Sequence, residues 1–314
     1  MTQPGPPLRR RLLLAASAGT AVGLLGGLIG LGGAEFRLPL LIGVFGFAAL
    51  QAVILNKAMS LIVVLTALPA RLLSVPYAAL APHWGAVATL LTGSLLGAWA
   101  GATWATRMRS TTLYRVLAVL LVLIGVALAW THTAGLEPLS LAPAVRTIIG
   151  TAAGAGIGIV AALMGVAGGE LLIPTIVLLF AVDIKIAGSL SLAVSLPTML
   201  VAFARYSRDN SFTVLGANRA FVLTMAGGSV AGTLLGGLLL GVVPAAILIP
   251  LLVALLLLSA NKIWRHQTPE AGATSDRASS SQCRNTVVGG RSVASRSSGL
   301  TQPRLRRGRS LSWT

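Results

Sequence analysis

The sequence predicts an all-helical, polytopic membrane protein built from two inverted repeats. Of its 314 residues, 55% are hydrophobic and only 10% are charged, and the mean hydropathy is +0.86. Soluble domains carry about 25% charged residues. Apolar runs that reach or approach the roughly 20 residues needed to cross a bilayer core are Gly85–Ala105, Leu113–Trp130, Arg219–Leu240 and Ala245–Asn261. One such span would only anchor a chain, so this many indicate helices packed together in lipid.

A constant offset relates the two halves, since Glu170 lies 135 positions after Glu35. Without a gap, the same offset carries Gly30 to Gly165, Gly33 to Gly168, Pro39 to Pro174, Ser60 to Ser195, Ser94 to Ser229 and Gly97 to Gly232. Leucines align by chance in any two membrane spans, but a series of Gly, Ser, Glu and Pro does not. We therefore predict two repeats, about 12–133 and 145–265, within a membrane transport domain of residues 1–266.

Each half contains an apolar segment, a glycine-rich break, a short apolar segment and three long spans. The short segments, Leu38–Phe47 and Leu171–Val182, have about a dozen residues. Helices of that length cannot cross the core at 1.5 Å per residue. We therefore expect each short segment to form a re-entrant hairpin, broken at the glycines, with the segment before it.

The basic residues predict the orientation, because short cytoplasmic loops are enriched in them. They form four clusters, namely Arg9–Arg11; Arg107, Arg109 and Arg115; Arg205, Arg208 and Arg219; and Lys262, Arg265 and the tail. All four clusters lie on the cytoplasmic side only if each hairpin returns to the face of the membrane from which it entered. Each half then crosses the membrane three times. The second half is then inverted relative to the first and both termini are cytoplasmic, with Arg71 and Arg146 as minor violations.

From residue 267 onward the chain is rich in Ser, Arg, Gly and Gln. Such a segment cannot bury enough apolar surface to fold, so we predict a disordered basic tail at 267–314. It could contact anionic lipid or nucleic acid, or remain solvated without a specific partner. The net charge of +17 does not indicate specific nucleic-acid binding, because the basic residues lie in short loops and the tail.

The two breaks form the candidate binding site. Breaking a helix in hydrocarbon leaves backbone groups unpaired unless protein or a watery cavity meets them. The short helix after each break would begin with N–H groups that carry about half a positive charge, which makes an anion site near the midplane. The candidate substrate-binding residues of the breaks are Gly30, Gly32, Gly33, Ala34, Glu35, Arg37, Gly165, Gly168, Gly169 and Glu170, and Pro39 and Pro174 are expected to mark the structural breaks.

Glu35 and Glu170 would lie in the first turn of each short helix. There they could exchange protons during transport, cap free backbone N–H groups, or do both. Arg37 and Lys57 have no basic counterpart in the second half. Each could face an anion or neutralise a glutamate, or could instead extend to the cytoplasmic interface.

Other small and polar residues complete the candidate set. On the helix after each hairpin, the polar residues that could donate to an oxyanion or join helices are Asn56, Ser60, Ser189, Ser191 and Ser195. Glycines at four-residue spacing are expected to be helix-packing stripes; they are Gly93, Gly97 and Gly101, and Gly228, Gly232 and Gly236. The sequence contains no P-loop, no H-E-x-x-H and no Cys/His cluster, so we predict no metal, no cofactor and no enzyme activity.

The stretches "GLIGLGGAEFRLPLL" and "ALMGVAGGELLIPTI" resemble the doubled motif of the sulfite exporter TauE/SafE family, roughly G-x-G-G-G-x-x-x-x-P. The resemblance covers about residues 12–265. Ala34 stands where a third glycine is usual, and Ala167 interrupts the second glycine run. The resemblance implies about eight helices in an inverted repeat and a permease of the bacterial inner membrane for small, often sulfur-containing oxyanions such as sulfite or organosulfonates.

Our hypothesis is therefore a secondary transporter for a small anionic solute. Rocking of one half against the other would alternate access, and a proton or other ion would couple transport through Glu35 or Glu170. A non-transporting membrane scaffold that docks a partner through the basic tail is the alternative from another class, and a channel is a third. The sequence gives no indication of the oligomeric state.

Overall fold

The computed structural model describes residues 8–29, 33–74, 77–133, 139, 141–238, 254, 257–261 and 263. All of them belong to one compact unit, Met1–Gln267. The predicted tail lies outside the described residues. Every regular element in the described part of the chain is a helix, with no strand, which confirms the all-α fold class.

The first half contains five long or intermediate helices and two short connecting ones. They are α1 (Leu8–Ile29), α2 (Ala34–Gly43), α3 (Ala49–Ser74), α4 (Tyr77–Leu80), the 3₁₀ turn η1 (Ala81–His83), α5 (Trp84–Arg107) and α6 (Ser110–Thr133). The second half follows with α7 (Pro143–Met164), α8 (Gly169–Phe180), α9 (Ile184–Tyr206), η2 (Asn210–Phe212), α10 (Thr213–Ala217) and α11 (Arg219–Leu238). The predicted last span, Ala245–Asn261, lies mostly outside the described residues.

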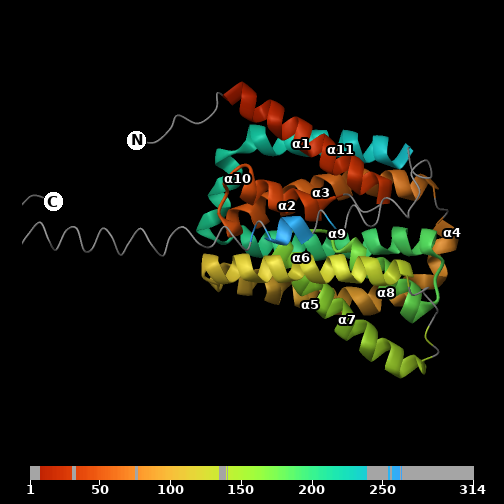
Figure 1. The fold of residues 1–314 in the computed structure, drawn as a ribbon. Coiled ribbons are helices and arrows are strands. Elements are labelled where there is room, and N and C mark those ends of the chain that lie inside the picture. The colour runs from red at the N-terminus through yellow and green to blue at the C-terminus, as the bar shows by residue number, and fades with distance from the viewer. Residues whose placement is uncertain are drawn as a thin grey trace, which may run out of the picture. The chain divides into compact units, whose positions relative to one another are not determined.

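The helix boundaries repeat with the offset seen in the sequence. Helices α7, α8, α9 and α11 each begin 135 positions after α1, α2, α3 and α5, respectively. The short helices α4 and α10, which follow α3 and α9, lie at opposite ends of the bundle (Figure 1), so α3 and α9 run in opposite directions. This is the arrangement expected of an inverted repeat.

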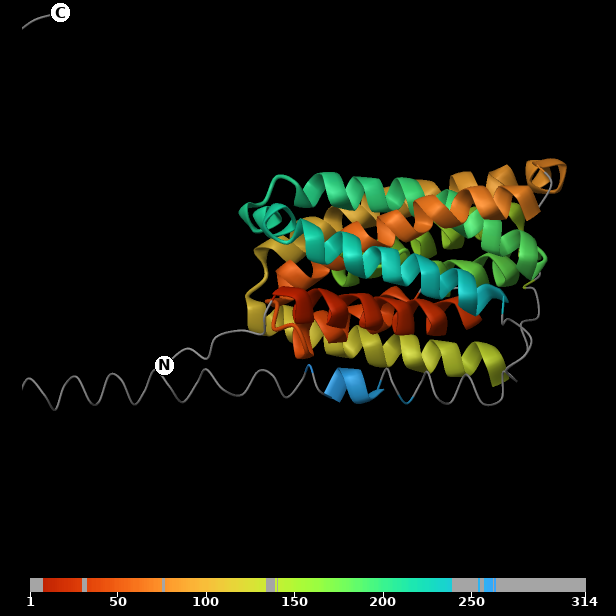
Figure 2. The ribbon, with the colours of Figure 1, turned by 90° about the horizontal axis from the view of Figure 1, so that it is seen from above.

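Six described segments are long and apolar enough to cross a membrane. They are Ala49–Thr66, Ala78–Arg107, Ser110–Ala127, Pro143–Met164, Ile186–Tyr206 and Arg219–Gly236. The chain is therefore a multi-pass membrane protein. Three of the predicted arginine clusters fall at the start of α1, at the α5–α6 turn and between α9 and α11, and these places share one end of the bundle (Figures 1 and 2).

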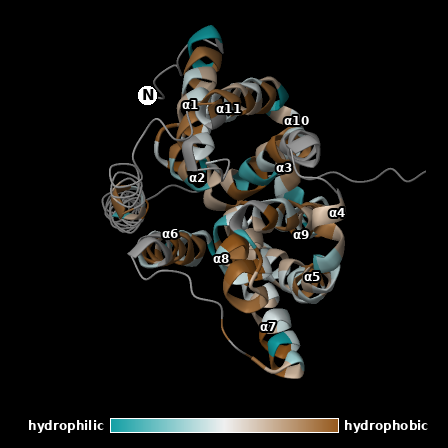
Figure 3. Ribbon diagram, turned by 90° about the vertical axis from the view of Figure 1, so that its right-hand side faces the viewer, coloured by the Kyte–Doolittle hydropathy of each residue, from teal (hydrophilic) through white to brown (hydrophobic). Residues whose placement is uncertain are grey.

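Helices of the two halves are interleaved. Seen along the bundle, α2, α3, α8 and α9 lie at the centre, with α1 and α11 on one side and α5 and α7 on the other (Figure 3). The pairs α1–α11 and α5–α7 form the most extensive helix contacts. Each pair joins one helix of the first half to one of the second.

Glycines bring these paired helices into close contact. A Cβ on Gly97 or Gly158 would collide with a backbone carbonyl across the α5–α7 contact, that of Ala155 or Ser94. Gly228 meets the Ala16 carbonyl in the same way across the α1–α11 contact. The predicted helix-packing role of the glycine stripes is confirmed for Gly93, Gly97, Gly101, Gly228 and Gly232, and Gly236 lies against Gly27.

Candidate functional site

Both short helices begin directly after a glycine with left-handed backbone. Gly33 precedes α2 with a φ of 68°, and Gly168 precedes α8 with a φ of 81°. Gly165, which ends α7, has a φ of 71°. Because side-chain-bearing residues rarely adopt such values, these three glycines allow the chain to reverse. Gly30 and Gly32 lie outside the described residues.

The short helices agree with the prediction in one respect and differ from it in another. They begin at Ala34 and Gly169, which places Glu35 and Glu170 in their first turns, as predicted. Pro39 and Pro174 do not mark the breaks but lie inside the helices. A proline has no N–H to donate to the carbonyl four residues earlier, so the carbonyls of Glu35 and Glu170 lose that partner.

Gly169 is the first residue of α8. Its φ lies outside the left-handed region, and an added Cβ would meet open space. The turn therefore does not require glycine at this position.

Asn56 on α3 connects the two hairpins. Its Nδ2 donates to the carbonyl of Ala34, at the start of α2, and to that of Met164, at the end of α7, each at 3.0 Å. These bonds use the amide donors that we expected to face an oxyanion. The atom left without a hydrogen-bond partner is the acceptor Oδ1.

Lys57, the next residue, holds the broken end of α7. Its Nζ donates to the carbonyls of Ala161 and Val166, each at 2.7 Å, and the residue is 0% exposed. The end of a helix carries unpaired carbonyls and partial negative charge, which an ammonium group stabilises. The alternative in which Lys57 extends to the membrane interface is therefore wrong, and its amine has an internal role.

Tyr206 on α9 is a site residue that sequence reasoning missed. Its buried hydroxyl donates to the carbonyl of Ala162 at 2.9 Å, so α7 is held from α9 as well as from α3. Two features of the sequence could have identified Tyr206. It is a polar residue in an apolar run, and the offset of 135 positions pairs it with Arg71 of the first half.

Arg37 presents an unused hydrogen-bonding edge inside the protein. The residue is 0% exposed, which excludes an extension to the interface, and its Nη1 donates to Ser60 Oγ at a long 3.4 Å. Its Nε and Nη2 have no partner. These two nitrogens lie on the same edge of the planar guanidinium group and form the fork that binds two oxygens of one anionic group.

Glu35 and Glu170 bring the two hairpins together. Each lies in the first turn of its helix, and the two carboxyl groups lie close enough to interact with each other. Glu35 also interacts electrostatically with Arg37. Glu35 Oε1 and Glu170 Oε2 are buried without a further partner. The glutamates thus face one another across the two hairpins.

The serines of the candidate set have different surroundings. Ser191 donates to the carbonyl of Gly188 within its own helix at 2.8 Å, so its hydroxyl proton is already used. Ser189 and Ser195 are buried and have no hydrogen-bond partner. The hydroxyls of Ser94 and Thr198, 2.7 Å apart, join α5 to α9.

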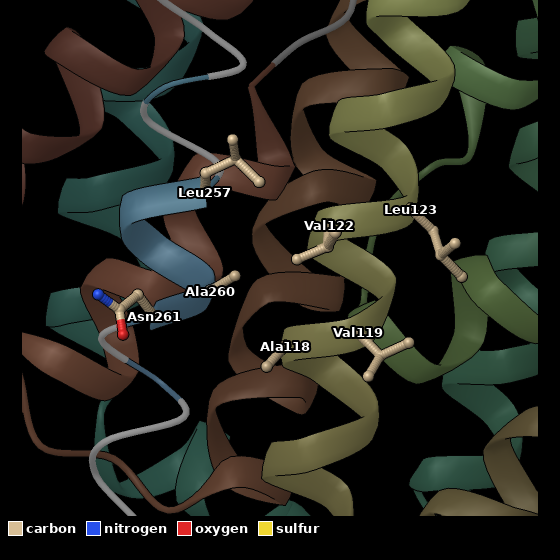
Figure 4. Close-up of a pocket in the computed structure, with 7 residues that line it drawn as sticks. All are labelled: Ala118, Val119, Val122, Leu123, Leu257, Ala260 and Asn261. Atoms are coloured by element: carbon tan, nitrogen blue, oxygen red, sulfur yellow. The ribbon is translucent and has the colours of Figure 1, made fainter.

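We name the group formed by Glu35, Arg37, Asn56, Lys57 and Glu170 the hairpin cluster. Four of its members are at most 3% exposed, and Glu170 is partly exposed, so the cluster is largely buried. A cavity of about 360 Å³ lies elsewhere, between α6 and residues 257–261 (Figure 4). Its lining is Ala118, Val119, Val122, Leu123, Leu257, Ala260 and Asn261. This lining carries no charged group and does not suit an oxyanion.

Comparison with known proteins identifies one family. The model of the family described as sulfite exporter TauE/SafE matches residues 2–128 and 149–300. The match extends beyond the expected range of 12–265 and includes much of the predicted tail. No curated protein and no solved structure matches the chain.

Proposed function

Because the chain belongs to the sulfite exporter TauE/SafE family, a family of membrane permeases, we propose that it is a secondary transporter for small sulfur-containing oxyanions. The proposed substrates are sulfite and organosulfonates. The hairpin cluster is the proposed binding site, and transport is coupled to protons. The sulfur specificity rests on the family alone.

The observation that carries this proposal is the free edge of Arg37 beside two facing carboxyl groups. A buried polar atom without a hydrogen bond costs about 1–3 kcal/mol, and more when it is charged. Two such nitrogens on one guanidinium group, in a part of the chain surrounded by apolar helices, indicate a ligand that supplies the missing acceptors. An oxyanion with two oxygens on one atom fits that edge.

The buried free edge of Arg37 corresponds to a closed state of the anion site in an alternating-access cycle. Opening on one side would expose the free edge of Arg37, and opening on the other would release the anion. The arginine clusters share one end of the bundle, which supports a cytoplasmic position for both termini. The proposed location of the protein is the inner membrane of a bacterial cell. The proposed partners are therefore a small anion and the lipid bilayer.

Flux into proteoliposomes tests the proposal. Purified full-length protein is reconstituted, and uptake of radiolabelled sulfite is measured with and without an inward proton gradient. Proton-driven accumulation is expected for the natural chain and is expected to be lost in Glu35→Gln and in Glu170→Gln, because the amide cannot exchange a proton.

Two results would count against parts of the proposal. Undiminished, proton-driven accumulation in both glutamine variants would remove these residues from coupling. Electrical currents far above transporter turnover would indicate a channel instead. Protein that elutes as a single species in detergent serves as the folding control for each variant.

A further inference from the structure

We infer that the hairpin cluster binds one monovalent oxyanion together with one proton, so that each transport step moves no net charge. This inference rests on the proposed function and adds to it the valence of the substrate and the ratio of proton to anion. Three features carry it: the free edge of Arg37, the contact between the carboxyl groups, and the sum of the buried charges.

The free edge of Arg37 defines the shape of the ligand. Ser60 fixes Nη1 on one side, which leaves Nε and Nη2 as a pair of parallel donors. Such a pair binds two oxygens bonded to one central atom, as in a sulfonate, a sulfite or a carboxylate. A spherical halide would use the two donors less well, so the edge favours oxyanions.

The carboxyl contact defines a place for one proton. An ionised carboxylate only accepts hydrogen bonds, whereas a protonated carboxyl group can donate one. Two ionised carboxylates side by side repel each other, so the contact between Glu35 and Glu170 is favourable only with a proton on one of them. Since the two residues come from the two different hairpins, this shared proton also connects the halves of the protein.

The buried charges then define the valence of the anion. With both carboxylates ionised, and with both Arg37 and Lys57 protonated, the four side chains sum to zero, and an anion would add an unbalanced charge. Such a charge is costly in a low-dielectric interior. One proton between the glutamates changes the sum to +1, which a monovalent anion returns to zero. A divalent anion would leave −1.

The charged groups whose side chains the structure describes on the neighbouring helices do not alter this sum. Helices α1, α3, α6, α7 and α9 pack against α2 and α8. Besides Lys57, their described charged groups are Arg9, Arg10, Arg11, Arg115, Arg146 and Arg205, all of which are exposed or partly exposed. Tyr206 is buried and neutral, and its hydroxyl is bonded to the Ala162 carbonyl. The side chains of Arg71, His132 and Lys185 lie outside those described.

A matched pair of anions tests the inference. Methanesulfonate and sulfate have similar size and tetrahedral shape, but the first carries one negative charge and the second carries two. In proteoliposomes of the full-length chain, we expect an inward proton gradient to drive methanesulfonate uptake, and sulfate uptake to be at least about tenfold slower. Because the step moves no net charge, a potassium diffusion potential set with valinomycin should leave methanesulfonate uptake unchanged. The same potential test is made on sulfite.

The outcomes separate this inference from the proposed function. Sulfate moving as fast as methanesulfonate, or uptake of methanesulfonate or sulfite that follows the membrane potential, overturns the inference and leaves transport intact. Failure of sulfite, sulfate and methanesulfonate alike to enter above the level of empty liposomes overturns the proposed function, and the inference with it.

Two variants test the role of Arg37. Arg37→Lys keeps the charge but loses the fork, so we expect the half-saturating methanesulfonate concentration to rise about tenfold or more while uptake stays insensitive to potential. Ser60→Ala removes only the anchor of Nη1 and should shift the same concentration by less. An unchanged half-saturating concentration in both variants would exclude Arg37 as the anion ligand.

Discussion

At the residue scale, the hairpin cluster shows how charged side chains can remain inside a membrane protein. The charged side chains differ in the groups that satisfy them. Lys57 donates to backbone carbonyls at a helix end, Glu35 and Glu170 bind each other, and Arg37 is only partly satisfied. Buried charge without compensation costs several kcal/mol, so Arg37, which has two nitrogens without a hydrogen-bond partner, is the member that indicates an anionic ligand.

Replacing Lys57 should destabilise the protein. In Lys57→Met the carbonyls of Ala161 and Val166 lose a charged donor, which we expect to cost about 2–5 kcal/mol. The measurement is the unfolding temperature of the purified protein in detergent. The matched control is Leu192→Met at the equivalent position of the second half, for which a change below about 1.5 kcal/mol is expected. Equal stability of the two variants would show that Lys57 does not hold α7.

These residues also show where sequence reasoning was limited. The repeat offset and the scarcity of charge identified all five members of the hairpin cluster as candidates. The sequence did not reveal which donor meets which acceptor, because Lys57 bonds to a carbonyl 104 positions away and Asn56 to one 108 positions away. Such contacts depend on how the helices pack, and for Asn56 this reversed the expected role of the amide.

At the scale of the elements, the helix pairs α1–α11 and α5–α7 depend on glycine at the contact. Here the sequence predicted the packing stripes but not their partners, since four-residue spacing shows that a helix has a small-residue face without showing what covers it. The positions and the first turns of the short helices followed from the glycines, whereas the left-handed conformation of Gly33 and Gly168 became known only from the backbone angles.

Two glycines on α7 test this packing, because replacing each by alanine should change the unfolding temperature differently. Gly158 faces the Ser94 carbonyl so closely that an added Cβ must displace α5, while a Cβ on Gly156 would meet open space. We expect Gly158→Ala to lower the unfolding temperature. Gly156→Ala should raise it or leave it unchanged, because alanine in a helix interior is favoured over glycine by about 1 kcal/mol. A fall of equal size in both variants would contradict the assignment of the contact.

At the scale of the whole molecule, the interleaving of the repeats changes the expected motion. The duplicated sequence predicts that one half rocks against the other. Helix α1 is closely packed on α11, and α5 on α7, so two rigid halves could not separate without breaking both contacts. We therefore expect the moving bodies to be these mixed helix pairs, sliding against the central α2, α3, α8 and α9. The sequence could predict the duplication, but not this exchange of partners between its copies.

The last prediction concerns the basic tail. All described helices and the whole hairpin cluster belong to the unit Met1–Gln267, whereas 268–314 contributes eight arginines, from Arg277 to Arg309, and few apolar residues. Deleting 268–314 should therefore leave the unfolding temperature and the sulfite flux of reconstituted protein unchanged. The family match reaches residue 300, which makes the deletion a strict test. A shorter deletion of 301–314 is the control, because it removes only residues beyond the match. Loss of flux in the long deletion alone would assign a transport role to 268–300. A protein that folds but shows no flux, and whose partner co-purifies only with the full chain, would favour the scaffold alternative.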